Sequence, residues 1–280
     1  MRVIKLWFST IKSTLTNLTA LAIFVLIYLL LLATFFKFIW TREATVWQVM
    51  VTYSFMVLIP AEFFIFQAAI IDRVRDGKFR WRTILIDAVK FFIITIPVLL
   101  LAWLINYLLN KWQLRYPPPV VPSLPVASGP APLQPIHWPS LLFATLRFVL
   151  LGIALPLATI HFWIAFAGGE VRALFAGGAA SFFKRFGAAF TRAFASESVL
   201  IYALGMLVFF MIPYAILFIP IAVRGNKTDF ALFIVRLSVT FVFSLIGWVV
   251  TISALTRKSL GTAPDSPTNR SPAVAMEAAA

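Results

Sequence analysis

Six blocks of apolar residues, each about twenty residues long or longer, recur along the chain and constrain its fold most. About 20 apolar residues are enough for a helix to cross a hydrocarbon core of about 30 Å. Of the 280 residues, 61% are hydrophobic and 12% are charged, whereas soluble domains carry about 25% charged residues. The chain has too little polar surface to cover itself in water, so we expect a polytopic membrane protein.

The predicted fold class is all-α, because lipid offers no hydrogen-bond partners to the backbone of an open strand. We expect six transmembrane helices, at about 18–40, 47–71, 88–109, 141–167, 198–223 and 230–255. Prolines lie well inside four of these spans, at Pro60, Pro97, Pro156 and Pro213. We expect them to kink their helices and neighbouring groups to satisfy the carbonyls that they free.

Most of the Lys and Arg lie in the N-terminal segment, in the loops after the second and fourth spans, and in the tail. The positive-inside rule then places both termini in the cytoplasm, in agreement with an even number of spans. The net charge of +14 comes from short loops beside apolar spans. Anionic lipid headgroups explain such charges better than nucleic acid does, so we expect lipid contact and no nucleic-acid partner.

Three further segments flank or interrupt the membrane domain, which we assign to residues 18–255. Residues 1–17 form an amphipathic N-terminal segment, and residues 256–280 lack apolar periodicity and are expected to be a disordered cytoplasmic tail. The outer loop at 116–140 is rich in proline and should be polyproline-like. It fits a spacer between two halves or a docking segment for a partner.

Basic amphipathic segments are predicted on the cytoplasmic side at 2–16, 79–90 and 179–195. At 100° per residue, apolar and aromatic residues share one face of each segment and basic residues lie opposite. Such helices fit the headgroup plane, with aromatic residues inward and basic residues toward anionic lipid; the alternative is a cytoplasmic helix packed on the bundle. The basic residues expected to face lipid or a partner are Arg73, Arg75, Lys78, Arg80, Lys184, Arg185 and Arg192.

Asp87 and Lys90 lie where the 79–90 segment runs into an apolar span. At helical spacing they fall in its polar stripe, and residues three apart can pair on a helix surface. We therefore expect both on the solvated edge of an interfacial helix, with the fully apolar span beginning near Phe91.

Glu62 and His161 are candidates for an intramembrane polar site, because an ionisable residue within a span is a functional candidate by default. Glu62 follows Pro60, and His161 lies in the inner half of the fourth span. If the second and fourth spans face each other, the two side chains could meet and share a proton. The alternative is a protonated Glu62 bonded to a nearby hydroxyl or carbonyl, and a His161 satisfied locally.

Two stretches, DGKFRWRTILIDAVKFF and AGGAASFFKRFGAAFTRAF, each lead through glycine, basic and aromatic residues into a span. Spans two and three therefore resemble spans four and five, as a parallel repeat about an axis along the membrane normal. On these stretches the chain resembles bacterial six-helix proteins of the glycerophosphoryl diester phosphodiesterase membrane-domain type and related families of unknown function, over about residues 47–223. The resemblance implies a bacterial inner-membrane protein without a catalytic domain, and it carries over no functional residues.

Catalytic motifs such as G-x-S-x-G, H-E-x-x-H and the P-loop do not occur in the sequence. With no Cys and two His, we expect no metal site, no cofactor and no enzyme activity. The leading hypothesis is a non-catalytic membrane protein that organises lipid or a partner protein at the cytoplasmic face. The alternative is a small-solute or lipid transporter that uses Glu62 and His161 between the two repeats.

Overall fold

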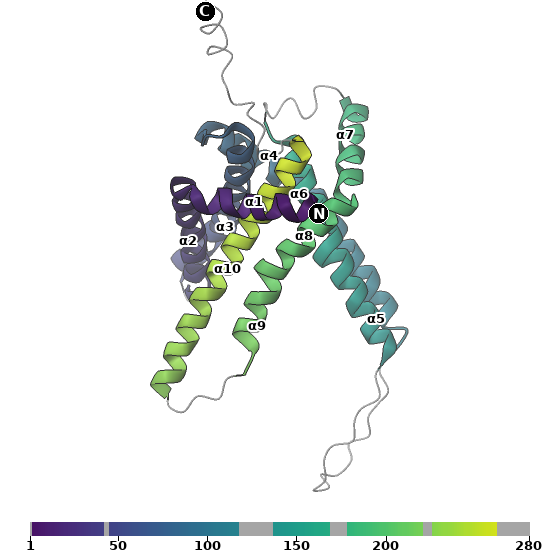
Figure 1. Ribbon diagram of the computed structural model, residues 1–280. Helices are drawn as coiled ribbons and strands as arrows, with labels where there is room; N and C mark the ends of the chain where they lie inside the picture. Colours follow the sequence, from purple (N-terminus) through teal and green to yellow (C-terminus); the bar gives the residue numbers. More distant parts are fainter. Residues whose placement is uncertain (1, 42–44, 118–136, 169–177, 221–225, 262–280) are drawn as a thin grey trace, which may run out of the picture.

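The computed structural model describes residues 2–41, 45–117, 137–168, 178–220 and 226–261 (Figure 1). Regular secondary structure in these ranges is entirely helical. The elements are α1 (Arg2–Thr16), α2 (Leu18–Trp40), α3 (Val46–Asp76), α4 (Trp81–Gln113), α5 (Trp138–Arg147), the π-helical segment η1 (Phe148–Ala154), α6 (Leu155–Phe166), α7 (Gly178–Ala193), α8 (Ser196–Met206), the π-helical segment η3 (Leu207–Met211), α9 (Ile212–Phe218) and α10 (Asn226–Leu260).

Six helical stretches of the described chain are long and apolar enough to cross a membrane, which confirms the predicted all-α class and span number. They are Leu18–Trp40, Val46–Asp76, Trp81–Gln113, Trp138–Phe166, Ser196–Phe218 and Lys227–Leu260. The chain is thus a multi-pass helical membrane protein. The last helix continues past the expected end at 255, and most of the proline-rich loop and of the tail lies outside the described residues.

The prediction of a separate interfacial helix at 79–90 is wrong. One helix, α4, runs from Trp81 to Gln113 without a break, and Asp87 and Lys90 are fully buried within it. Protein rather than water covers the Asp87 and Lys90 part of the polar face, whereas Arg80 is exposed. A helical phase identifies residues that share a face and does not say what that face contacts.

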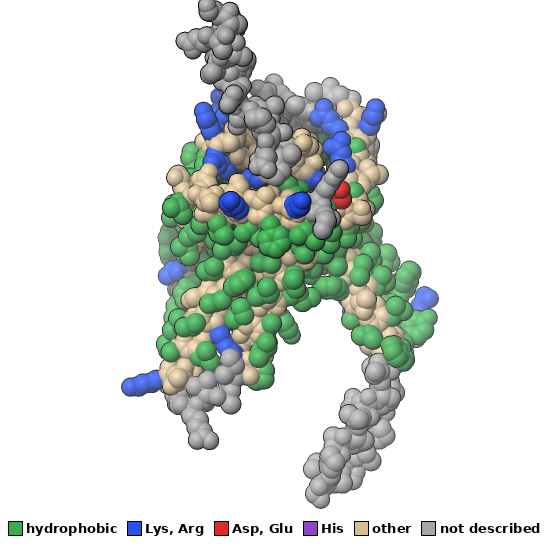
Figure 2. Space-filling model, viewed as in Figure 1, with side chains coloured by type: hydrophobic (Ala, Val, Ile, Leu, Met, Phe, Trp, Pro, Cys, Tyr) green, Lys and Arg blue, Asp and Glu red, His purple; other side chains and the backbone are tan. Residues whose placement is uncertain are grey.

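The helices pack around α3 and α10. In the described chain α3 lies against α2, α4 and α10, while α10 also lies along α8, η3 and α9. Toward one end the molecule divides into two legs, one with α5 and one with α9 and α10 (Figures 1 and 2). Most of the side surface of the space-filling view is apolar, as expected for a surface in contact with lipid (Figure 2).

Basic side chains gather at the opposite end of the bundle, where α1 runs across the helices and α10 finishes (Figures 1 and 2). We call this the basic end. Its described Lys and Arg residues are Lys5, Lys12, Arg73, Arg75, Lys78, Arg80, Arg82, Lys184, Arg185, Arg192, Arg257 and Lys258.

Pro156 and Pro213 each follow a π-helical segment, η1 and η3 respectively. A proline has no N–H for the carbonyl four residues earlier. For Pro156 that carbonyl belongs to Gly152 and accepts from the Tyr202 hydroxyl at 3.2 Å. For Pro213 the Phe209 carbonyl accepts from Ser244 Oγ at 3.3 Å, so the expectation that neighbours satisfy the freed carbonyls is confirmed at these two prolines.

Glycine allows α10 to approach α8 closely. A Cβ placed on Gly205 would lie 1.9 Å from Thr251 Oγ1 and 2.8 Å from Thr251 Cβ. Small residues permit such short distances between helices in a membrane, where packing rather than water exclusion drives helix association. The α8–α10 contact therefore depends on the missing side chain at Gly205.

Candidate functional site

A charge cluster of three buried and two half-buried side chains lies at the basic end and joins α3 to α4. The Arg75 guanidinium is its centre, with Nη2 at 2.9 Å from Asp72 Oδ1 and Nε at 3.0 Å from Asp76 Oδ1. Its Nη1 lies 3.6 Å from Asp87 Oδ2, and Asp87 also pairs with Lys90. We define the charge cluster as Asp72, Arg75, Asp76, Asp87 and Lys90.

The segment that leaves α6 completes the charge cluster with main-chain groups. Lys90 Nζ donates to the Phe166 carbonyl at 3.0 Å and to the Gly168 carbonyl at 2.7 Å. Asp87 Oδ2 accepts from the Gly168 N–H at 2.7 Å. Because an ammonium has three donors, Asp87 and the two carbonyls satisfy Lys90 completely. The arrangement therefore clamps the end of α6 to α4.

Gly168 adopts φ = +83° and faces Arg75. We expect Gly168→Ala to destabilise the protein, because a left-handed backbone costs a residue with a Cβ about 1–2 kcal/mol. The added Cβ would also lie 2.6 Å from Arg75 Nη1 and displace the guanidinium. The measurement is the thermal unfolding midpoint in detergent.

Gly77→Ala is the matched control for Gly168→Ala. Gly77 has φ = +68°, and a Cβ there would meet nothing within 4 Å, so the control carries the backbone strain without the collision. Gly168→Ala should therefore lower the midpoint more than Gly77→Ala. Equal shifts would contradict the described contact between Gly168 and Arg75.

Glu62 and His161 are both buried, in α3 and α6 respectively. Glu62 Oε1 accepts from Thr34 Oγ1 of α2 at 3.0 Å, which is the local arrangement that the sequence left open. Among the described residues, no hydrogen bond or ion pair joins Glu62 to His161. Glu62 thus hydrogen-bonds to α2. The helix that carries His161, α6, packs mainly on α7 and α4.

The basic residues predicted to face lipid or a partner divide into three groups. Arg75 turns inward to the carboxylates of the charge cluster, and its contact with lipid or a partner stays a prediction. Arg73 is half-buried, with its guanidinium carbon 5.6 Å from the centre of the Phe79 ring. The exposed members are Lys78, Arg80, Lys184, Arg185 and Arg192.

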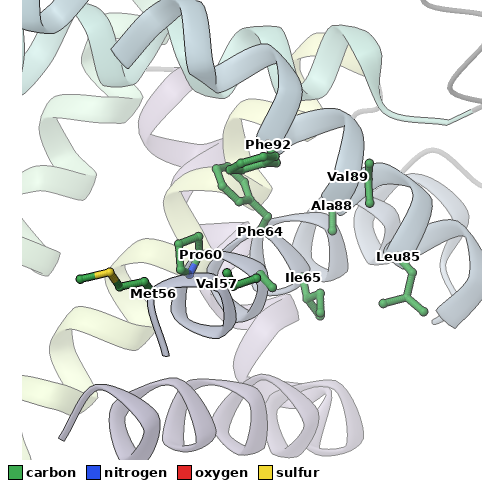
Figure 3. A pocket seen from close by; sticks show the side chains of 10 residues that line it. Met56, Val57, Pro60, Phe64, Ile65, Leu85, Ala88, Val89 and Phe92 are labelled. Carbon is green, nitrogen blue, oxygen red and sulfur yellow. The ribbon is translucent and has the colours of Figure 1, made fainter. Parts of the chain in front are cut away.

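An apolar groove of ≈ 380 Å³ lies between α3 and α4 (Figure 3). Pro60 and Phe64 face it from α3, and Ala88 and Phe92 face it from α4 (Figure 3). We call it the α3–α4 groove. The full lining is Met56, Val57, Pro60, Ala61, Phe64, Ile65, Leu85, Ala88, Val89 and Phe92.

Trp81 and Arg82 lie in the first turn of α4, about one turn before the groove residue Leu85. Residues three or four apart lie on one helix face, so Arg82 shares a face with Leu85, and Trp81 does so as well. Both Trp81 and Arg82 are exposed. An apolar groove with a Trp and a basic residue one helical turn before its lining matches a phospholipid, with its acyl chain in the groove and its headgroup at the interface.

Comparison with known proteins adds no relative. Protein-family models, curated proteins and solved structures contain no match to this chain. The resemblance to the glycerophosphoryl diester phosphodiesterase membrane-domain type therefore stays a prediction.

Sequence reasoning missed the burial of Asp87 and Lys90. A signal for this burial was present, because charged residues inside a span usually face protein and pair with one another. No sequence pattern near Lys90 predicts its main-chain partners at Phe166 and Gly168, which come more than seventy residues later.

Proposed function

We propose that the chain is a non-catalytic protein of the bacterial inner membrane that gathers anionic phospholipid at its basic end, which faces the cytoplasm. The observation that carries this proposal is the α3–α4 groove, an apolar groove whose lining residue Leu85 follows the exposed Trp81 and Arg82 by about one turn of α4. Each Lys or Arg near an anionic membrane surface contributes about 1 kcal/mol of attraction. Several such residues enrich anionic lipid without any catalytic group.

The placement of α1 supports this proposal. In Figure 1 α1 runs across the bundle at the basic end. Trp7 and Thr10 are buried against the bundle, whereas Lys5 and Lys12 are exposed. We infer that α1 lies in the headgroup plane, with its basic residues toward lipid phosphates.

The amphipathic helix α7 has a different orientation. In Figure 1 it runs more nearly along the bundle than across it. Ala189 and Ala193 are its buried residues near α8, while Lys184 and Arg185 are exposed. We infer that α7 presents its basic residues away from the membrane more than α1 does, so a partner protein fits α7 better than lipid.

Charge reversal separates the two kinds of binding. A basic-end variant carries Lys5→Glu, Lys12→Glu and Arg82→Glu, and an α7 variant carries Lys184→Glu, Arg185→Glu and Arg192→Glu. The protein is reconstituted in nanodiscs of phosphatidylglycerol and phosphatidylcholine, and the lipids retained after mild extraction are counted by mass spectrometry. We expect the basic-end variant to lower the retained ratio of phosphatidylglycerol to phosphatidylcholine at least about fivefold.

The matched control reverses three exposed basic residues at the opposite end, namely Lys37, Lys111 and Lys227. This control should leave the lipid ratio close to that of the wild type. If the basic-end variant and the control change the ratio equally, the basic end has no special role in lipid binding. If only the α7 variant loses a co-purifying protein and every lipid ratio stays constant, the function is partner binding instead.

The transport alternative gains no support from the arrangement of Glu62 and His161. Transport through that site would need the two side chains to line one water-accessible space, and neither lines the α3–α4 groove. The transport hypothesis also assumed that spans two and three repeat as spans four and five, but the helices around the corresponding prolines differ. The repeat pairs Pro60 with Pro156, yet Pro60 lies inside a continuous α-helix while Pro156 follows a π-helical segment.

A further inference from the structure

A cavity of ≈ 250 Å³ lies within the spans, between α2, α3, η3 and α10. We call it the aromatic cavity, because aromatic rings form much of its wall. A water molecule occupies about 30 Å³ of liquid volume, so the aromatic cavity has room for part of an organic molecule. Its described lining is Tyr28, Leu31, Phe63, Phe66, Gln67, Phe209, Ser244, Leu245 and Trp248.

The amide of Gln67 has a fixed orientation in this wall. Its Oε1 accepts a hydrogen bond from Trp248 Nε1 at 2.9 Å. An indole N–H can only donate, so the oxygen rather than the nitrogen of the amide must face Trp248. The two N–H donors of Gln67 Nε2 therefore need an acceptor other than Trp248.

Gln67 Nε2 is a buried donor without an acceptor among the described residues. The side chain of Gln67 is fully buried, and its Nε2 forms no hydrogen bond within the described chain. Ser244 of the same lining differs, because its Oγ donates to the Phe209 carbonyl at 3.3 Å. An unpaired buried donor is costly, and hydrocarbon chains offer it no acceptor. An acceptor oxygen on a bound molecule would remove this cost.

The rest of the aromatic cavity suits an uncharged, apolar molecule. Its described lining contains no Lys, Arg, Asp or Glu. The rings of the wall also support one another: Phe209 and Trp248 pack edge to face with centroids 5.1 Å apart, and Tyr28 and Phe66 lie 6.1 Å apart. A wall that is formed before binding lowers the cost of ordering on binding.

The depth of Gln67 indicates which acceptor can reach it. Gln67 lies nine residues before the end of α3 at Asp76, or about 13 Å at 1.5 Å per residue. The 31 residues of α3 are about 46 Å long, whereas the hydrocarbon core is about 30 Å thick. If the two ends of α3 share the excess equally, Gln67 lies about 5 Å inside the hydrocarbon boundary on the side of the basic end. The ester carbonyls of a glycerolipid join its acyl chains at this boundary.

Bilayer lipid adjoins the spans that form the aromatic cavity. Its lining residues belong to transmembrane stretches, and Tyr28, Leu31 and Phe63 are half-buried on them. We propose that the aromatic cavity binds an acyl chain of one glycerolipid, whose ester carbonyl accepts a hydrogen bond from Gln67 Nε2. This site recognises an uncharged ester and not a headgroup, so it does not depend on the proposed gathering of anionic lipid at the basic end.

The test compares two lipids that differ in the carbonyl oxygen. The full chain, purified and delipidated in detergent, is incubated with an equimolar mixture of a diacyl and a dialkyl phosphatidylcholine of equal chain length. The first bound lipid is quantified by native mass spectrometry. We expect the wild type to retain the ester over the ether lipid at least about fivefold, the factor that one net hydrogen bond supplies.

Substitutions assign this preference to Gln67. Gln67→Met preserves most of the side-chain volume without the amide and should bring the ratio of ester to ether lipid close to one. Because Gln67→Met also leaves Trp248 Nε1 without its acceptor, a second variant combines it with Trp248→Phe and should give the same ratio. Trp248→Phe alone keeps the Gln67 donor and should keep the preference.

Ser244→Ala is the matched control, since it removes a polar group of the same cavity that already has a partner. It should retain the preference for the ester lipid. The proposal is overturned if the wild type binds the two lipids equally, or if Gln67→Met and Ser244→Ala change the ratio equally. Both lipids carry the same zwitterionic headgroup, so neither outcome depends on the charge reversals that test the basic end.

Discussion

Lys90→Met is expected to lower the free energy of unfolding by about 3–5 kcal/mol, the cost of removing one partner from a buried ion pair. Met preserves most of the side-chain volume, so the effect comes from charge rather than from a cavity. Without Lys90, Asp87 keeps the Gly168 N–H and a more distant Arg75, and two buried carbonyls lose their donor. The loss is measured by chemical or thermal unfolding in a fixed detergent.

Two further variants make the Lys90 prediction specific. Lys78→Met removes an exposed ammonium two residues after the end of α3, and such surface changes usually stay within about 0.5 kcal/mol. Adding Asp87→Asn to Lys90→Met removes the uncompensated carboxylate and should recover part of the loss, with the coupling read from a double-mutant cycle. If Lys90→Met costs no more than Lys78→Met, Lys90 is not buried in an ion pair.

Gly205→Ala is the second change with a large expected effect. Its Cβ would lie 1.9 Å from Thr251 Oγ1 and 2.8 Å from Thr251 Cβ, so rotation of the Thr251 side chain alone cannot relieve the collision. Overpacking of this kind costs about 1–3 kcal/mol and occasionally more. We expect the unfolding midpoint to fall, because α8 must move away from α10.

Gly187→Ala in α7 is the control for Gly205→Ala. A Cβ on Gly187 would meet nothing within 4 Å, and replacing a helical Gly by Ala favours the helix by about 1 kcal/mol. The two Gly→Ala changes should therefore shift the midpoint in opposite directions. Thr251→Ala should partly rescue Gly205→Ala, and a Gly205→Ala variant as stable as the wild type would contradict the close contact between the helices.

The number and type of the spans followed from the sequence because bilayer thickness sets the length of an apolar helix. The ends of α3 and α4 did not follow, because these helices continue into charged residues. Asp72 and Arg75 lie in the last turns of α3, where they pair with each other and Arg75 contacts Asp87 of α4. Local composition predicts water at such positions, and only the packing of two helices shows that protein replaces it.

Hydrogen-bond partners from distant parts of the chain could not be predicted from the sequence either, because only the packing of the helices brings them together. The prolines at 156 and 213 predicted freed carbonyls, which is a local effect of a missing N–H. The donors are Tyr202 and Ser244, and no spacing in the sequence relates either residue to its proline.

The clamp between α4 and the end of α6 has a consequence for how the protein is made. The ribosome synthesises Phe166 and Gly168, whose carbonyls bind Lys90, after it has synthesised α4. When α4 enters the membrane, Lys90 therefore lacks these two partners. An ammonium without these partners is costly away from water. We therefore expect the beginning of α4 to stay near the membrane surface in the nascent chain and to reach its final depth only after α6 has inserted.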